Sequence, residues 1–253
     1  MRSAQVRPDG SRIRWAELHE GAPGPARVYL HGLGASSAPY YAGVLTHPAL
    51  AGRRSLLMDL LGFGISDRPA DAGYTMEDHA GWVASAIRAA GAGPAEIVAH
   101  SMGGTMAVVL ADRHPDVVAG LVVVDSSLDP ITPVLVPGSS GIATYTEADF
   151  LAHGIGETLA RVGEHWASTM RLAAPVALYR SAVSLTKTGV RDRLRNLTIP
   201  RAFVYPAEDG ALPGEAELVA SGVRVRAVAD SGHNIMLDNP EAFANAVSAT
   251  FIA

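Results

Sequence analysis

Residues 97–104 of the chain read Ile97-Val98-Ala99-His100-Ser101-Met102-Gly103-Gly104. The apolar run predicts a buried β-strand that ends at Ala99, and the residues from Gly103 to Arg113 predict a helix. Ser101 therefore lies where a strand turns into a helix, between small residues that leave room for a tight, strained turn. A buried strand that leads straight into a helix is typical of a sheet with helical crossovers, so this stretch favours an α/β fold.

The rest of the chain repeats this alternation of short β-rich runs and longer Ala-rich segments, which is the pattern of a mostly parallel, doubly wound sheet. We expect strands at Arg27–Leu30, Ser55–Asp59, Glu96–Ala99, Leu121–Val124, Ala202–Tyr205 and Val223–Val228, with an edge hairpin strand in Ser11–His19. We expect helices at Met76–Ala90, Gly103–Arg113 and Pro240–Phe251. Thr75 and Asn239 stand where helix caps are expected, and Asp78 would complete a capping box with Thr75.

The alternation stops between about Leu128 and Thr188, where no strong strand signal occurs. Several prolines and a Gly-Ser loop at Gly138–Gly141 precede helical runs, which begin near Thr146 with a second capping pattern. We therefore expect a helical lid or cap at residues 128–188, inserted into one core formed by residues 1–127 and 189–253. Long insertions of this kind usually cover or bind something, although a purely supporting subdomain is the alternative.

The composition bounds the class of protein. The 253 residues are 48% hydrophobic and 18% charged, with a formal net charge of −5, which predicts a globular chain and argues against a nucleic-acid partner. No apolar run reaches the roughly 18 residues that a membrane-spanning helix needs. The polar stretch Met1–Gly10 does not resemble a signal peptide. We expect a soluble, cytoplasmic protein that binds no membrane, and the sequence leaves its oligomeric state open.

Several kinds of chemistry are excluded by residues that are missing. The chain has no cysteine, which removes disulfides, thiolate metal sites and a cysteine nucleophile. Its single lysine, Lys187, follows Thr186 rather than a glycine, so no Walker A loop is present. Neither Gly32-Leu33-Gly34 nor Gly62-Phe63-Gly64 has the third glycine of a dinucleotide-binding fingerprint. The histidines lack metal-binding spacings, so we expect neither a metal nor an organic cofactor.

Ser101 is the first candidate for a catalytic role. Its hydroxyl would stand at a helix N-terminus, where backbone N–H groups and the helix dipole favour a developing negative charge. This is the arrangement of a nucleophile elbow, whose usual pattern is Gly-x-Ser-x-Gly. Here Ala99 replaces the first glycine. Taken alone, the pentapeptide also fits a serine that only caps the following helix.

Four motifs in order resemble those of the α/β-hydrolase family, and the resemblance spans nearly the whole chain. They are His31-Gly32-Leu33-Gly34, the stretch Asp59–Pro69, the elbow around Ser101, and Gly232-His233. The resemblance implies that Ser101 is the nucleophile and His233 its general base. It also implies an oxyanion hole made by the backbone N–H groups of Leu33 and Met102, with His31 hydrogen-bonded inside that loop.

The acidic member of the triad is assigned by chain order. Asp209 follows the Ala202–Tyr205 strand, and the order Ser101, Asp209, His233 is the family's usual one. Asp125 ends the preceding strand, where some relatives carry the acid instead, and Glu208 is a weaker contender. We predict Asp209. His100 is adjacent to Ser101, but the elbow points neighbouring side chains apart, so we expect it to pack beneath the turn.

The resemblance implies a serine hydrolase that cleaves a carboxylic ester or lactone through an acyl-enzyme. A carbon–carbon bond hydrolase, a thioesterase and a cofactor-free perhydrolase would use the same triad, and some members of the fold are receptors. We expect a small-molecule substrate with an apolar acyl or aromatic part, held in a pocket that includes Phe150, Trp166 and Tyr179. The same apolar side chains are equally expected of ordinary packing between the insertion and the core.

Overall fold

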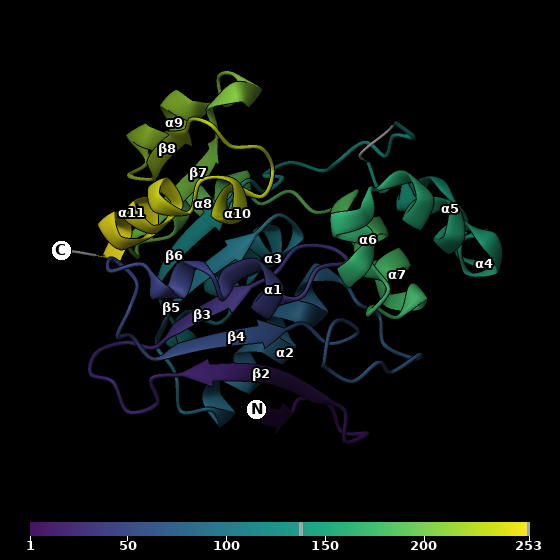
Figure 1. Ribbon diagram of the computed structural model, residues 1–253, viewed down its shortest axis with the longest axis horizontal. Helices are drawn as coiled ribbons and strands as arrows, with labels where there is room; N and C mark the ends of the chain where they lie inside the picture. Colours follow the sequence, from purple (N-terminus) through teal and green to yellow (C-terminus); the bar gives the residue numbers. More distant parts are fainter. Residues whose placement is uncertain (137–138, 252–253) are drawn as a thin grey trace.

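The computed structural model describes residues 1–136 and 139–251. Within these residues the chain forms one eight-stranded sheet in the order β1-β2-β4-β3-β5-β6-β7-β8 (Figure 1). The strands are β1 (Arg2–Gln5), β2 (Arg12–Leu18), β3 (Arg27–Leu30), β4 (Ser55–Asp59), β5 (Ala95–His100), β6 (Val118–Val124), β7 (Arg201–Pro206) and β8 (Arg224–Val228). Strand β2 runs antiparallel to β1 and β4, and the other neighbours are parallel. The predicted α/β class and mostly parallel sheet are confirmed.

Helices cover both faces of the sheet. One face packs against α2 (Met76–Ala89), α3 (Met102–Arg113), α8 (Arg191–Asn196) and α9 (Glu215–Ala220). The other face packs against α1 (Ser37–Tyr41), α10 (Ile235–Asp238) and α11 (Pro240–Phe251). Short 3₁₀ turns are η1 (Val44–Thr46), η2 (Pro115–Val117) and η5 (Ala207–Asp209).

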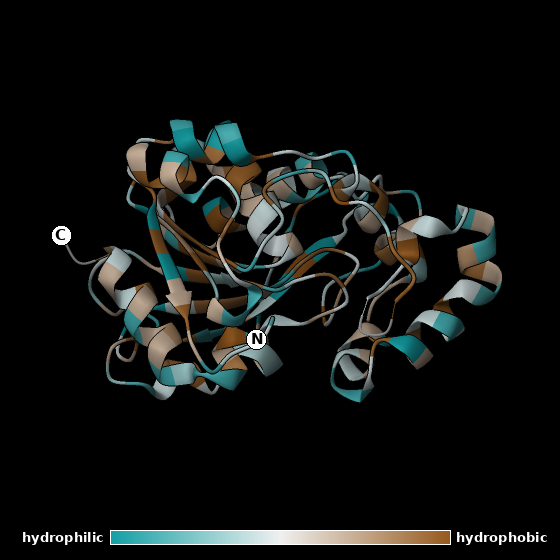
Figure 2. Cartoon of the chain, turned by 90° about the horizontal axis from the view of Figure 1, so that it is seen from above, coloured by the Kyte–Doolittle hydropathy of each residue, from teal (hydrophilic) through white to brown (hydrophobic). Residues whose placement is uncertain are grey.

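The central strands are apolar along their whole length because both of their faces are covered. In β5, Ile97 and Ala99 belong to the core on the α2–α3 side, whereas Val98 belongs to the core on the α11 side. Successive side chains of a strand point to opposite faces, so one short strand serves two cores. In Figure 2 the strands of the sheet are accordingly drawn largely in the brown of hydrophobic residues.

The helix caps agree with the sequence. Thr75 Oγ1 accepts a hydrogen bond from the Asp78 N–H at 3.0 Å, and the Asp78 carboxylate accepts one from the Thr75 N–H at 3.1 Å, which completes the predicted capping box. Asn239 Oδ1 accepts from the Ala242 N–H at 3.1 Å. Thr146 Oγ1 accepts from the Asp149 N–H at 3.2 Å at the start of a short helix.

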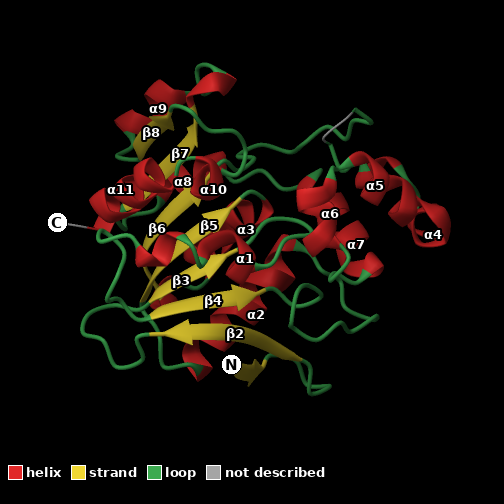
Figure 3. Cartoon of the chain, viewed as in Figure 1, coloured by secondary structure: helices red, strands yellow, loops and turns green. Residues whose placement is uncertain are grey.

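Between β6 and β7 the chain leaves the sheet. The elements within residues 128–188 are η3 (Ile142–Thr144), α4 (Glu147–Asp149), the π-helical turn η4 (Phe150–Gly154), α5 (Ile155–Arg161), α6 (Glu164–Met170) and α7 (Pro175–Leu185). No strand occurs among the described residues of this stretch, which we call the helical segment. It lies beyond the arrowheads of the parallel strands, at the right of Figure 3. Pro137 and Gly138, at the start of the expected Gly-Ser loop, lie outside the described residues.

None of the helices in the described ranges combines the length and the apolarity that crossing a bilayer requires.

Candidate active site

Ser101 occupies a strained turn between β5 and α3. Its backbone has φ 54° and ψ −125°, in a region that residues other than glycine rarely adopt. The turn is fixed by the hydrogen bond from the Ser101 N–H to the Val124 carbonyl, at 2.9 Å. Because a parallel sheet places the ends of neighbouring strands at one edge, the turn holds the Ser101 side chain over the junction of β5 and β6.

Glycines beside Ser101 let the backbone segments approach closely. A Cβ on Gly103 would lie 2.4 Å from the His31 carbonyl oxygen, and one on Gly104 would lie 1.9 Å from Ser126 Oγ. A Cβ on Gly32 would lie 3.0 Å from the Cβ of Ser101 itself. The first turn of α3 therefore packs directly against the loops after β3 and β6. The small residues around Ser101 led us to expect such a close contact.

His233 is held by Asp125. The His233 Nδ1–Asp125 Oδ2 distance is 2.5 Å, and Asp125 directly follows β6. A carboxylate can only accept this hydrogen bond, so the proton lies on Nδ1 and Nε2 keeps its lone pair. The Asp125 side chain is 20% exposed and that of His233 53% exposed, so the pair lies at the rim of the core rather than inside it. This geometry orients an imidazole for use as a base.

The structure corrects the assignment of Asp209. Asp209 ends η5 after β7 and is exposed, and no hydrogen bond joins it to His233 within the residues described. The reason is the path of the loop after β8: the bond from His100 Nε2 to the His233 carbonyl, at 2.8 Å, holds His233 beside the end of β5, where Asp125 at the end of β6 reaches it. The neighbouring Glu208 carboxylate instead accepts a hydrogen bond from the Asp230 N–H at 2.8 Å, which ties the loop after β7 to the loop after β8.

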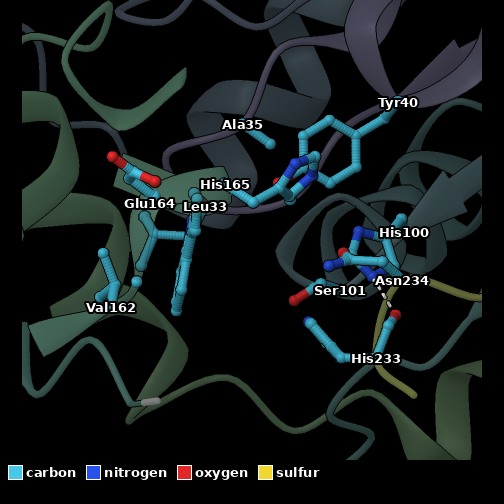
Figure 4. A pocket seen from close by; sticks show the side chains of 13 residues that line it. Leu33, Ala35, Tyr40, His100, Ser101, Val162, Glu164, His165, His233 and Asn234 are labelled. Atoms are coloured by element: carbon cyan, nitrogen blue, oxygen red, sulfur yellow. Dashed lines mark hydrogen bonds between the residues drawn. The ribbon is translucent and has the colours of Figure 1, made fainter. Parts of the chain in front are cut away.

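Ser101 and His233 line the same cavity. Figure 4 shows both at one end of it, across from Val162 and Glu164. In the described part of the chain no hydrogen bond joins Ser101 to His233. Hydrogen bonds between catalytic groups are often long in the free protein and shorten when substrate binds, so the open geometry is compatible with a nucleophile and its base.

The loop after β3 is organised around His31, which is fully buried. Its Nδ1–H donates to the Gly32 carbonyl at 2.7 Å, and its Nε2 accepts from the Leu60 N–H at 3.0 Å, which fixes a neutral tautomer. Burial also lowers the pKa of His31, which opposes protonation. The expected hydrogen bond of His31 within this loop is confirmed.

The same contact aims the Leu33 amide. In a planar trans peptide the N–H and C=O groups point in opposite directions. The Gly32 carbonyl is occupied by His31 and by the Ala35 N–H at 3.2 Å, so the Leu33 N–H points away from them. Within residues 1–136 and 139–251 neither the Leu33 nor the Met102 N–H has a hydrogen-bond acceptor in the protein. Both remain available to a ligand beside Ser101.

Asp59 holds the turn after β4 and has no place in the cavity. Its carboxylate accepts hydrogen bonds from the Ser37 N–H at 2.7 Å and from the Ile65 N–H at 2.9 Å. Gly64 is packed against it, since a Cβ there would lie 1.9 Å from Asp59 Oδ2. Asp59 is therefore a turn-forming residue.

His100 is buried beside Ser101 but also lines the cavity and contacts His233, which corrects the expectation that it packs beneath the turn. Its Nε2–H donates to the His233 carbonyl at 2.8 Å, and the two rings lie 4.5 Å apart between centroids. Burial holds the pKa of His100 well below 6.5, so the ring stays neutral beside the base. The sequence reasoning missed this contact, because it joins residues 133 positions apart.

The cavity over Ser101 has a volume of about 360 Å³. It lies between the loops of the core and the start of α6, and its lining is Gly32, Leu33, Ala35, Tyr40, His100, Ser101, Val162, Gly163, Glu164, His165, Trp166, His233 and Asn234. The lining includes the predicted Trp166. Tyr40, Glu164, His165 and Asn234 were missed, since nothing in the local sequence distinguishes them from surface or core residues.

Phe150 and Tyr179 do not line this cavity, which corrects the expectation for both. Phe150 is fully buried, with its ring centroid 5.9 Å from that of Tyr145 and 5.8 Å from that of Tyr179. The Tyr179 hydroxyl donates to the Tyr145 carbonyl at 3.0 Å. These aromatic rings form the interior of the helical segment, because a segment of this size must bury apolar side chains of its own.

No cluster of three or more His, Asp or Glu side chains suited to a metal ion occurs among the residues that the structure describes.

A match to a known protein family shows to which family the chain belongs. Residues 26–212 match the family described as the alpha/beta hydrolase fold. The chain belongs to the α/β-hydrolase fold family. Within this family the chain departs from the usual elbow at Ala99, whose side chain is fully buried in the core on the α2–α3 side. The chain also pairs His233 with Asp125, after β6, rather than with Asp209, after β7.

Relatives within the α/β-hydrolase fold family carry several hydrolase names. The chain is 29% identical to 2-hydroxymuconate semialdehyde hydrolase of Pseudomonas putida over 91% of this chain and 88% of the relative. It is 30% identical to the pimeloyl-[acyl-carrier protein] methyl ester esterase of Aeromonas hydrophila, over 75% and 79% of the two chains. A putative aryl esterase from Burkholderia cenocepacia has a similar structure, with a TM-score of 0.76, 25% identity and coverage of 98% and 97%. These names support a hydrolase enzyme.

Proposed function

We propose that the protein is a serine hydrolase that cleaves a carboxylic ester or lactone, with Ser101 as nucleophile, His233 as general base and Asp125 as the acid that orients His233. The observation that carries the proposal is the 2.5 Å contact between Asp125 and His233 beside the strained turn of Ser101. A serine hydroxyl is a weak nucleophile until a neighbouring imidazole takes its proton. Strain at the turn is a feature that proteins retain where a side chain must be presented.

The reaction would proceed through an acyl-enzyme. Ser101 Oγ attacks the carbonyl carbon while His233 Nε2 takes the serine proton, and Asp125 stabilises the resulting imidazolium. The N–H groups of Leu33 and Met102 donate to the oxyanion of the tetrahedral intermediate. His233 then protonates the leaving oxygen, and the ester bond breaks. A water molecule, deprotonated by His233, repeats the sequence on the acyl-enzyme and releases the acid.

As part of this proposal, the helical segment acts as a lid over the cavity. Residues Val162 to Trp166, where α6 begins, line the cavity, and Figure 4 shows Val162 and Glu164 across it from Ser101. A volume of about 360 Å³ suits a compact small-molecule substrate. Leu33, Ala35 and Val162 offer an apolar wall for an acyl or aromatic part, and Tyr40 and Asn234 offer polar groups to the remainder.

A carbon–carbon bond hydrolase is the second candidate. It is favoured by the relative from Pseudomonas putida, which is similar over nine-tenths of this chain and is named for action on 2-hydroxymuconate semialdehyde. The same three side chains would serve that reaction, so only the substrate separates the two functions. The thioesterase and receptor alternatives predicted from the sequence are tested in the same series of assays.

Labelling by a fluorophosphonate probe tests the proposed nucleophile. We expect the wild-type protein to be labelled and Ser101→Ala to remain unlabelled, because the probe phosphonylates an activated serine. Turnover of p-nitrophenyl esters of graded chain length would then measure the size of the acyl site. Turnover of 2-hydroxymuconate semialdehyde in preference to every ester and thioester would favour the second candidate. Absence of both labelling and turnover would contradict the enzyme and favour a receptor.

A further inference from the structure

The helical segment contacts the loop that carries the Leu33 amide. Trp166, in α6, donates its indole Nε1–H to the Leu33 carbonyl at 2.7 Å. The bond joins residues 133 positions apart, and Trp166 is partly buried at the wall of the cavity. It is therefore a specific contact between the helical segment and the loop after β3, rather than a contact within either of them.

The same helix packs on the next residue of the loop. Gly34 has φ +67°, and a Cβ added there would lie 2.9 Å from Cε and 3.0 Å from Cγ of Met170. Met170 is fully buried and lies one helical turn after Trp166. Immediately after α6, the Leu172 carbonyl accepts hydrogen bonds from Arg68 Nε at 3.0 Å and Arg68 Nη2 at 2.7 Å. Helix α6 is thus fastened to the core at both of its ends.

These contacts constrain both peptide planes that meet at Leu33. The plane that carries the Leu33 N–H is held from the core, through the bond from His31 to the Gly32 carbonyl. The plane that carries the Leu33 carbonyl is held from the helical segment, through Trp166. Two rigid planes joined at one Cα can move only by changing φ or ψ, so fixing both planes fixes the direction of the N–H.

We propose that Trp166 is a positioning residue for the oxyanion hole: its bond to the Leu33 carbonyl keeps the Leu33 N–H aimed at the reacting carbonyl beside Ser101. The helical segment then completes the catalytic apparatus as well as covering the cavity. This inference rests on the proposed serine hydrolase function. Its basis is the 2.7 Å bond together with the packing of Met170 on Gly34.

Trp166→Phe is the variant that tests the proposal, since phenylalanine keeps an aromatic ring at the wall but removes the N–H donor. Loss of an oxyanion donor itself costs about 10²–10³ in kcat, so loosening one should cost less. We expect kcat on the best p-nitrophenyl ester to fall about tenfold, with KM changed by less than about twofold. Trp82→Phe is the matched control: Trp82 packs against Tyr74 and His79, away from the cavity lining, and should leave both constants unchanged.

A second readout separates positioning from general damage to the cavity. A trifluoromethyl ketone analogue of the ester forms a tetrahedral adduct with the serine, and the adduct's oxyanion uses the same amides as the transition state. We expect Trp166→Phe to weaken its inhibition by the same factor as kcat/KM. The matching non-fluorinated alcohol, which binds without an adduct, should keep its affinity. Equal weakening of both ligands, or an unchanged kcat, would overturn the proposal.

The outcomes remain distinct from those that test the proposed function. If wild-type protein is labelled by fluorophosphonate and Trp166→Phe keeps full kcat, only the positioning role fails. If wild-type protein neither reacts nor turns over esters, the proposed function and the positioning role fail together. Should thermal melting show that Trp166→Phe is unfolded, Trp166→Met replaces it. That variant also removes the indole N–H donor to the Leu33 carbonyl, and we expect the same loss in kcat and in ketone affinity, with an unchanged kcat again overturning the proposal.

Discussion

Asp125 contacts His233 although 108 positions separate them in the chain, because the loops after β6 and β8 meet at one edge of the sheet. Strand β5 has β3 on one side and β6 on the other, so the loops after these three strands meet at one edge. The Asp125 N–H donates to the Val204 carbonyl of β7 at 2.8 Å, which anchors the residue as the sheet ends. Its φ of 41° turns the backbone away from the strand. Asp tolerates this conformation better than most residues do.

If the proposed function holds, Asp125→Asn should therefore abolish most of the turnover of p-nitrophenyl esters. An amide can donate to Nδ1 and so favour the wrong tautomer of His233, and a comparable change in a serine protease triad costs about 10⁴ in kcat. The measurement is kcat on the best p-nitrophenyl ester, with circular dichroism to confirm folding. Asp209→Asn is the matched control and should retain activity close to wild type. Loss of activity in Asp209→Asn with Asp125→Asn active would return the acid to Asp209.

At the scale of elements, the close packing at the junction of β5 and α3 depends on Gly104 having no side chain. A Cβ on Gly104 would lie 1.9 Å from Ser126 Oγ, 2.9 Å from Ser126 Cβ and 3.0 Å from the Ala99 carbonyl oxygen. Ser126 follows β6 directly after Asp125, so pressure at this point would move the residue that holds His233. Gly104 therefore allows the close packing of α3 on the loop after β6, and it also keeps Asp125 in place beside His233.

Gly104→Ala should destabilise the protein, by about 1–3 kcal/mol, because one added methyl group overfills a closed contact. Gly81→Ala is the control: a Cβ there meets nothing within 4 Å, so replacing glycine in the middle of α2 should stabilise by about 0.5–1 kcal/mol. Urea unfolding gives both values. A Gly104→Ala variant as stable as wild type would show that Ser126 can move aside without cost.

Elements with strong patterns could be predicted from the sequence, and weakly patterned ones could not. Strands β3 and β4 have the predicted bounds, because each is a short apolar run bounded by polar or turn residues. Strand β6 begins three residues earlier than expected, at Val118. Strand β1 was missed because only Ala4 of its four residues is buried, so no apolar alternation marks it.

The residues of the site also fall into those that the sequence could predict and those that it could not. Ser101, His233 and the loop at Leu33 follow strands and carry local motifs, so their positions could be inferred from the chain. The partner of His233 could not, since Asp125 and Asp209 follow neighbouring strands and only the path of the loop after β8 decides which of them reaches His233. Of the cavity lining that comes from the helical segment, only Trp166 was predicted. An apolar residue such as Phe150 looks the same in a sequence whether it faces a ligand or other helices.

On the scale of the whole molecule, three buried histidines tie stability to pH. His31, His79 and His100 are buried, and burial lowers the pKa of each below 6.5, in His79 to about 3. His79 Nε2 also contacts Ser181 Oγ at 3.0 Å, which links α2 to α7 of the helical segment. Each of these rings must be neutral in the folded state, whereas in the unfolded chain each is free to take up a proton near pH 6.5.

Stability should consequently fall as the pH falls below about 6.5. Where the folded pKa lies under the unfolded one, the unfolded state binds more protons, so the contribution is complete above pH 6.5 and is lost towards pH 3. For His79 the loss between pH 7 and 5 is about 2 kcal/mol. His79→Phe should shrink the loss of unfolding free energy measured by urea titration at these two pH values by that amount. His153→Gln, at an exposed histidine, should leave the loss unchanged, and equal losses in all three proteins would contradict the assignment.

The parallel pairing of β3 with β5 has a kinetic consequence. It joins Arg27 to Glu96 and Leu30 to Ala99, residues about seventy positions apart, and the Trp166 and His100 contacts span 133 positions. Closing such long loops costs entropy that no local interaction returns, so folding of this topology is expected to be slow and cooperative. Ser101, His233 and the N–H groups of Leu33 and Met102 then come together only as the sheet and the helical segment dock. During refolding, enzyme activity would accordingly return at the rate of the slowest structural phase, and partly folded chains would be inactive.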